Sequence, residues 1–308
     1  MPLTPVLSED QGRQSLLALQ AADLRVATVA YRLAAAGTAI CPNKSSLTGL
    51  TLHDSAQYAL SLRQSARLAF GLNDKVAVLA VAPESPAQRA GLRAGDAFLT
   101  IGGARLRQPL ATKKATYAGV ASAYALLEAS AAAGPVQLDL EREGRTIAAR
   151  LVPIAGCASR LQLLPRSTVE ARADGSILSI TTGLLDFVAD DNELALVIAH
   201  EMAHNALGHR ALLKSQGVRR GFFESFGGNA AKVRETERAA DRLGYFLMAR
   251  AGFDLAVAPA FWVRLYHGPA KARSRSASHP DARSRIDEAR QAVQEIAMKR
   301  SANLPLSP

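Results

Sequence analysis

The sequence predicts an α+β protein with a mainly helical domain that carries a small sheet, and a separate module rich in β-strands. A chain of 308 residues has room for about two such domains. Residues 194–209 and 234–254 place polar side chains four positions apart among apolar ones, which indicates helices with one functional face. Residues 76–152 instead alternate short apolar runs with glycine and proline turns, which indicates strands.

Residues 1–60 are predicted to form a helical segment that packs on the helical domain. Residues 24–40 supply its amphipathic pattern, in which Arg25 and Arg32 interrupt the apolar positions. The chain has no uninterrupted run of about eighteen apolar residues, so no transmembrane helix is expected. The start of the chain also lacks the basic residues and apolar core of a signal peptide.

The net charge of +10 raises the question whether nucleic acid is a partner. However, the basic residues are scattered, aromatic residues make up only 5% of the chain, and no nucleic-acid-binding motif is present. We therefore expect no nucleic-acid partner. A solvated basic surface that attracts acidic substrates or anionic envelope polymers accounts for the charge.

Residues 61–155 are predicted to form the β-rich module. Three short motifs follow a strand that begins at Val76, namely Ser85-Pro86-Ala87, Ala90-Gly91-Leu92 and Gly95-Asp96. Their order resembles the bacterial PDZ domain. The resemblance continues through a helix and then two strands joined by a tight turn, at 117–132, 136–140 and 146–152.

The resemblance to a PDZ domain implies that this module binds extended peptides or C-termini at a sheet edge beside a helix. We expect the carboxylate-binding loop at Leu68–Leu72, and the groove between the strand after Gly71 and the helix that carries Tyr124. The alternative is a packing or oligomerisation module whose peptide groove is closed.

Cys41 and Cys157 flank this module, which predicts a disulfide that ties together the two ends of an inserted domain. Closing so long a loop contributes about 4 to 5 kcal/mol in the chain-entropy model. A disulfide implies an oxidising compartment, so we expect a periplasmic or secreted bacterial protein whose signal peptide is absent from this chain. Two buried thiols in a cytosolic protein are the alternative.

A strand and a helix are predicted next along the chain. Residues 177–182 are rich in β-branched side chains and lie between Asp174-Gly175 and Gly183, which indicates a strand. Residues 190–193, Asp-Asp-Asn-Glu, have the pattern of a capping box, and apolar residues follow at helical spacing.

This helix carries a metal-site motif in the stretch VIAHEMAHNALGH, residues 197–209. His200 and His204 are four positions apart, so they share a face and can hold one Zn²⁺, while Glu201 falls near the open coordination position. A base beside a metal-activated water is the arrangement that peptide hydrolysis requires. The alternative is a helix whose histidines are solvated or bonded within a core.

A catalytic zinc usually has three protein ligands, which predicts a third one downstream. Glu237 and Asp241 share a face of the second helix and can supply a ligand and a partner that orients a histidine. Exposed ion pairs with neighbouring arginines are the alternative, and Glu235 fits that alternative better. His209 lies five residues after His204, not the six that long-motif zinc proteases use, so we interpret it as structural or as a contact of a ligand.

Four motifs in order, HEMAH, ERAADRLG, AGFD and SHPDARSRI, resemble the gluzincin metallopeptidases of family forty-eight, which include the CAAX prenyl protease, HtpX and BepA. The resemblance covers roughly residues 160–295. It implies the zinc ligands His200, His204 and Glu237 and the catalytic base Glu201. It also implies support from Asp241, and roles near the active-site cleft for His279 and Arg285.

The last two residues have alternative interpretations. His279 can occupy the fourth zinc position in a resting state, or its His-Pro pair can be a plain turn element. Arg285 can bind a substrate carbonyl or a developing oxyanion, or it can be one more cation of a basic run. The strand at 177–182 is interpreted as an edge strand that holds substrate in extended form, with a core strand as the alternative.

We therefore expect residues 156–299 to be a gluzincin-type metallopeptidase domain with one Zn²⁺ per chain, and residues 300–308 to be a disordered tail. The expected function is that of an endopeptidase in envelope protein quality control. Its PDZ domain would recruit or gate substrates, such as unfolded envelope proteins or C-termini. The alternative is a PDZ-mediated chaperone or scaffold whose zinc site is inactive or structural.

Overall fold

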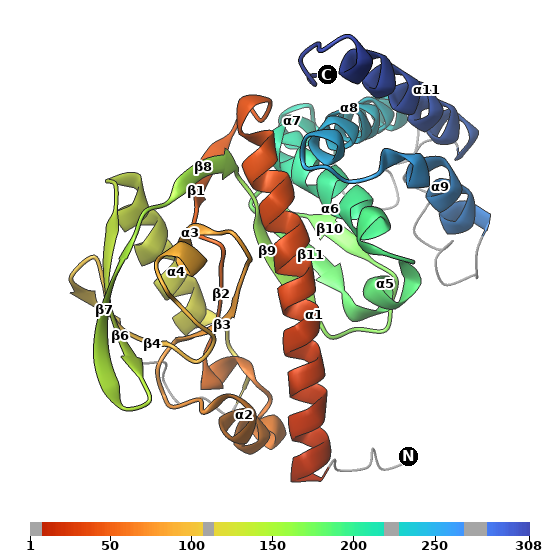
Figure 1. The fold of residues 1–308 in the computed structure, drawn as a ribbon. Helices are drawn as coiled ribbons and strands as arrows, with labels where there is room; N and C mark the ends of the chain where they lie inside the picture. The colour runs from red at the N-terminus through yellow and green to blue at the C-terminus, as the bar shows by residue number, and fades with distance from the viewer. Residues whose placement is uncertain (1–7, 107–113, 219–227, 268–281) are drawn as a thin grey trace. The chain divides into compact units, whose positions relative to one another are not determined.

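The structure is a computed structural model that describes residues 8–106, 114–218, 228–267 and 282–308. The chain forms two compact units (Figure 1). The first unit consists of Met1–Thr28 and Ser46–Ile154, and the second of Val29–Ser45 and Ala155–Pro308. Helices and several sheets are both present, which confirms the predicted α+β class.

Helix α1 (Glu9–Ala36) contributes residues to both units. In the first unit, Gln20 Nε2 donates a hydrogen bond to the carbonyl of Leu79. In the second unit, the guanidinium of Arg32 lies 4.2 Å from the ring centre of Phe253. The helix thus belongs to the β-rich unit up to Thr28 and to the second unit from Val29 onwards.

The first unit is built on an antiparallel sheet with the strand order β2-β3-β4-β6-β7, and β5 pairs with β4. Helices α3 and α4 supply the apolar side chains that complete its core with Phe98, Ile101 and Leu140. The elements are β2 (Leu50–His53), α2 (Arg63–Phe70), β3 (Ala77–Val81), α3 (Pro86–Arg89), β4 (Ala97–Ile101), β5 (Ala104–Arg105), α4 (Ala118–Ala132), β6 (Val136–Arg142) and β7 (Arg145–Leu151).

Two expectations about the peptide groove are wrong. Residues Leu68–Leu72 are not a binding loop, because α2 runs to Phe70 and the left-handed Gly71, with φ of 60°, ends it. The strand after Gly71 is β3, which is paired on both sides and has no free edge. The sheet begins earlier than expected, since β2 already belongs to it, and β2 is its edge strand beside α4.

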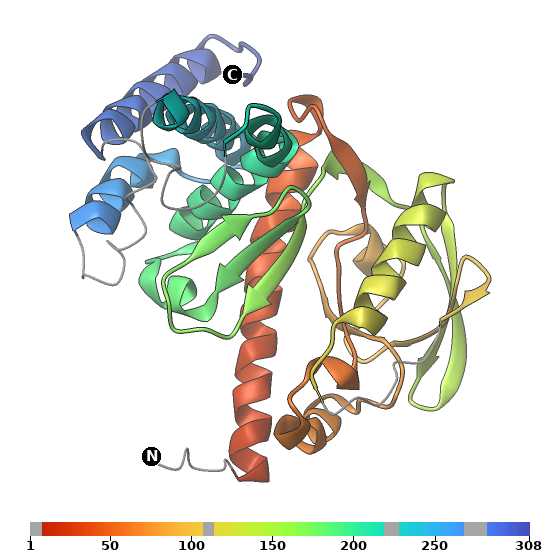
Figure 2. The same cartoon turned by 180° about the vertical axis from the view of Figure 1, so that it is seen from behind.

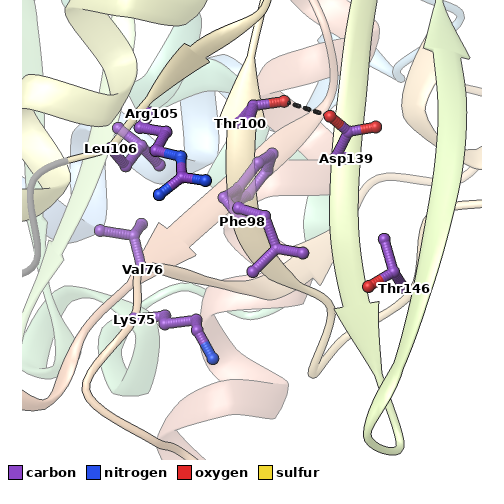
Figure 3. A pocket seen from close by; sticks show the side chains of 9 residues that line it. Lys75, Val76, Phe98, Thr100, Arg105, Leu106, Asp139 and Thr146 are labelled. Carbon is purple, nitrogen blue, oxygen red and sulfur yellow. Dashed lines mark hydrogen bonds between the residues drawn. The ribbon is translucent and has the colours of Figure 1, made fainter.

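A pocket of about 470 Å³ lies on the first unit, lined by residues of β4 to β7 and the chain before β3 (Figure 3). Thr100 Oγ1 donates a hydrogen bond of 2.7 Å to Asp139 Oδ2 in its wall. Lys75 and Arg105 are among the residues that line it. The lining includes no residue of β2 or α4, so the pocket is separate from the edge of the sheet beside α4.

The second unit combines a three-stranded sheet with helices that pack around α6. Figure 2 shows the sheet against α6, which β10 and β11 contact. Its elements are β9 (Arg160–Leu164), β10 (Ala171–Ala173), β11 (Ile177–Thr181), α5 (Thr182–Phe187), α6 (Asp191–Ala206), α7 (His209–Ser215), α8 (Gly228–Arg250), α9 (Ala258–His267) and α11 (Ala282–Ser301). Strands β1 (Lys44–Leu47) and β8 (Ile154–Cys157) pair where the chain passes between the units.

The strand predicted at 177–182 is present as β11, but it is not an edge strand. It lies between β10, to which it is antiparallel, and β9, to which it is parallel. Leu178 and Ile180 are fully buried, as expected for a central strand. The expected role of β11 in holding substrate by backbone pairing is therefore wrong, because its backbone already pairs on both sides.

The predicted disulfide between Cys41 and Cys157 is confirmed. Both cysteines are buried in the second unit, and the segment 46–154 of the first unit lies between them in the chain. Gly37 leaves space for the bond, because a Cβ at this position would lie 2.3 Å from Cys157 Sγ. The disulfide therefore joins the two points at which the chain leaves and re-enters the second unit.

The chain beyond α11 lacks helix and strand after Ser301. Two of its carbonyls nevertheless accept hydrogen bonds, since Lys299 Nζ donates to Ser307 and Arg250 donates to Leu306. The segment was expected to be disordered, but these hydrogen bonds attach it to the ends of α11 and α8. Among the helices of the described ranges, none combines the length and apolarity needed to cross a membrane.

Candidate metal centre

Helix α6 begins where the capping pattern predicted. Asp190 Oδ1 accepts hydrogen bonds from the backbone N–H groups of Asn192 and Glu193, at 2.9 and 3.0 Å. The carboxylate of Glu193 accepts from the N–H of Ala189 and pairs with Arg264. These caps fix the start of a buried helix, and so fix which of its faces carries the histidines.

Helix α8 crosses α6 at close range because residue 244 is glycine. A Cβ at Gly244 would lie 3.2 Å from the backbone C of Ala199 and the backbone N of His200. Glu237 and Asp241 precede Gly244 on the same face of α8, so both carboxylates point towards α6. The close crossing explains how two acids from one helix reach the histidines of another.

The side chains of His200, His204 and Glu237 converge, with one ligand atom of each within 4.8 Å of the others. The two Nε2 atoms are 3.1 Å apart. Glu237 Oε2 lies 3.4 Å from Nε2 of His200, and its Oε1 lies 3.4 Å from Nε2 of His204. Tetrahedral zinc with bonds of about 2.0 to 2.1 Å separates its ligand atoms by roughly 3.4 Å. The donor types and their spacing therefore fit a zinc ion.

Asp241 and Arg285 hold the imidazole of His200 on its Nδ1 side. Asp241 Oδ1 lies 2.8 Å from His200 Nδ1, and Arg285 donates to both oxygens of Asp241, at 2.6 and 2.7 Å. Burial by itself raises the pKa of Asp241, but Arg285 and His200 outweigh burial and hold that pKa below its usual value. An ionised Asp241 accepts the Nδ1 proton of His200, so Nε2 is the nitrogen that remains for a metal.

Arg285 lies inside the protein, where its side chain is 2% exposed. Its guanidinium also stacks 3.6 Å from the ring centre of Trp262. The interpretation as one more exposed cation is therefore wrong. Because its nitrogens face Asp241, this placement favours a role in positioning the Asp241–His200 pair over contact with substrate.

His209 contacts a proposed zinc ligand, which is one of the two alternatives that the sequence left open. It is the first residue of α7, it is buried, and its Nδ1 lies 2.9 Å from Nδ1 of His204. Burial first, and then the charge of His204, lower the pKa of His209 to about 4, so its ring is neutral at pH 7. A neutral His209 can accept the Nδ1 proton of His204, which leaves Nε2 of His204 for a metal.

Replacing His209 by alanine is expected to weaken zinc binding about 10- to 100-fold, because the His204 Nδ1–H loses its acceptor. Competition with a chromophoric chelator measures the zinc affinity directly, without any assay of activity. The control is Lys214→Ala, an exposed position on the same helix. An affinity of the His209 variant equal to that of the Lys214 variant would show that this contact does not tune the site.

The remaining predicted residues are placed as follows. Glu201 is half-buried on α6, next to His200 and outside the triangle of donor atoms. Glu235 is exposed, unlike Glu237, which agrees with the surface role expected for it. His279 lies outside the described residues.

Comparison with known protein families finds one match within each unit. The family described as Peptidase family M48 matches residues 169–230, which contain both histidines of the triangle and Glu201 but end before Glu237. The PDZ domain family matches residues 78–119. A crystal structure of the HtrA3 PDZ domain bound to a phage-derived ligand covers 37% of this chain and 89% of its own, with 20% identity and a TM-score of 0.27.

Two curated relatives are each 27% identical to part of the chain. A protein of Vibrio cholerae named beta-barrel assembly-enhancing protease aligns over 148 residues, 38% of this chain and 31% of the relative. The mitochondrial metalloendopeptidase OMA1 of Schizosaccharomyces pombe aligns over 150 residues, 42% of this chain and 44% of the relative. The alignments thus span less than half of either relative. The two family models therefore identify a domain of peptidase family M48 at residues 169–230 and a PDZ domain at residues 78–119.

Proposed function

We propose that this chain is a zinc-dependent endopeptidase. The observation that carries the proposal is the triangle of His200, His204 and Glu237, with Glu201 beside it on α6. Two imidazoles and one carboxylate at tetrahedral spacing are the protein ligands of a catalytic zinc, which keeps its fourth position open. The names of the two relatives, a protease and a metalloendopeptidase, support the same reaction class.

In the proposed reaction, His200, His204 and Glu237 hold the metal. Bound zinc would polarise the scissile carbonyl and lower the pKa of a water molecule. The carboxylate of Glu201 accepts the proton of the attacking water and passes it to the nitrogen of the departing amine. Asp241 with Arg285 orients His200, and His209 orients His204.

We further propose that the enzyme acts on unfolded or misassembled proteins of the bacterial envelope, and that the PDZ domain recruits or gates them. The disulfide between Cys41 and Cys157 supports an oxidising compartment. The name of the Vibrio cholerae relative refers to the assembly of β-barrel proteins, which supports the envelope as the place of action.

Removal and return of the metal tests the proposed function. The purified full chain is expected to hold one zinc per molecule and to cleave fluorescent casein. A chelator should abolish cleavage, and an equimolar amount of Zn²⁺ should restore it. A protein with one tightly bound zinc and no cleavage of casein would contradict the proposal and favour a PDZ-mediated chaperone or scaffold with a structural zinc site.

A further inference from the structure

The edge strand β2 is the position at which a peptide could join the sheet of the first unit. Strand β2 pairs with β3 on one side only, and its other side faces α4. In a strand, the N–H and C=O of alternate residues point to the same side. The carbonyl of Gly49 bonds to Ala82, next to β3, so the backbone groups of Leu50 and Leu52 point away from β3.

Tyr124 of α4 forms hydrogen bonds with these outward backbone groups. Its hydroxyl accepts a hydrogen bond from the N–H of Leu52, at 3.0 Å, and donates one to the carbonyl of Leu50, at 3.3 Å. The N–H of Leu50 bonds to Thr48 Oγ1, at 3.3 Å. A peptide strand added at this edge would need the same backbone groups.

The core of the first unit holds the tyrosine in this place. Tyr124 is half-buried, and it packs against the buried cluster that includes Val120 and Leu127 of its own helix. The side chains of Leu50 and Leu52 belong to the same cluster. Packing therefore keeps the ring against the strand, and its hydroxyl substitutes for the backbone of an added strand.

We infer that Tyr124 closes the peptide edge of this PDZ domain, and that an extended peptide pairs with β2 only after the Tyr124 hydroxyl releases Leu50 and Leu52. The inference rests on the proposed role of the PDZ domain in substrate recruitment, and it adds a gate to that role. A peptide that enters this edge breaks both hydrogen bonds of the hydroxyl. Their loss on peptide entry weakens peptide binding about tenfold or more.

Hydrogen exchange tests the contact itself. In the full chain, Tyr124→Phe removes only the hydroxyl and keeps the ring that packs on the core. The amide of Leu52 is expected to exchange about tenfold faster or more in this variant. The matched control is Tyr117→Phe, just before α4, which should exchange as the wild type does. Unchanged exchange of Leu52 in a folded Tyr124→Phe protein would overturn the inference.

Peptide binding tests the gate. A phage library of random C-terminal peptides is selected on the full-length wild type and on both variants, and the best peptides are made with a fluorescent label. We expect dissociation constants about tenfold lower for Tyr124→Phe than for the wild type and Tyr117→Phe. Equal constants, or a Tyr124→Phe protein that selects no peptide, would overturn the inference. Neither measurement depends on zinc or cleavage. A chain without peptidase activity would therefore contradict the proposed function and leave the inference about Tyr124 unaffected.

Discussion

Replacement of Glu201 by glutamine is expected to reduce casein cleavage about 10²- to 10⁴-fold, with the zinc content unchanged. Glutamine has nearly the same shape as glutamate but cannot accept a proton from the attacking water. Glu201 lies outside the triangle of donor atoms, so its loss should leave the metal in place. Metal analysis and a casein assay on the same preparation measure both quantities.

The control for Glu201→Gln is Glu235→Gln, which removes an exposed carboxylate of the second unit. This variant should retain both zinc and full activity. If Glu201→Gln cleaves casein at the wild-type rate, then Glu201 is not the base. If it also loses its zinc, then Glu201 holds the metal and the ligand set proposed above is incorrect.

Replacement of Glu237 by glutamine is expected to lower zinc affinity by more than about 100-fold and to abolish cleavage at ordinary zinc concentrations. Residues that hydrogen-bond to a metal ligand already contribute about 10- to 100-fold to metal affinity. Loss of a charged ligand itself should lower the affinity further. The two Nε2 atoms, 3.1 Å apart, would then lack the carboxylate that completes the triangle.

Zinc affinity in a chelator competition, followed by casein cleavage at increasing zinc, measures this effect. Glu235→Gln is again the matched control, because it removes the same charge two residues earlier on α8. Wild-type zinc affinity in Glu237→Gln would refute the assignment of Glu237 as a ligand. The two variants are thus expected to differ in zinc content. Glu201→Gln should retain zinc without cleaving casein, whereas Glu237→Gln should lose the zinc.

The elements near the metal were predictable because their signals are local. The spacing of His200 and His204 places them on one face of any helix, and the polar run at 190–193 starts that helix where the structure has it. The position of β11 was equally local, since three of its five residues, Ile177, Ile180 and Thr181, have β-branched side chains, which favour a strand. Its place in the middle of the sheet depends on β9 and β10, and no pattern within the strand encodes it.

Contacts between distant segments were harder to predict. The choice of Glu237 over Glu235 as the acid that reaches α6 agrees with the sequence prediction, but the structure supplies the reason, which is the close helix crossing at Gly244. The SHPDARSRI motif implied a role for Arg285 near the active-site cleft, but the run of arginines did not indicate its burial against Asp241 and Trp262. The sequence did not decide whether His209 contacts His204, because the direction of α7 depends on the left-handed conformation of Gly208 before it.

The sequence by itself determined the helices with their caps, the metal-binding motif, the flanking cysteines and the presence of a PDZ module, because each depends on residues within a few turns or on a recurrent order of motifs. Only the tertiary structure decided which strand has a free edge, which side chain covers it, and which distant residues orient the two histidines. Those features arise from strand pairing and helix packing between residues far apart in the chain, where many arrangements satisfy the same local pattern.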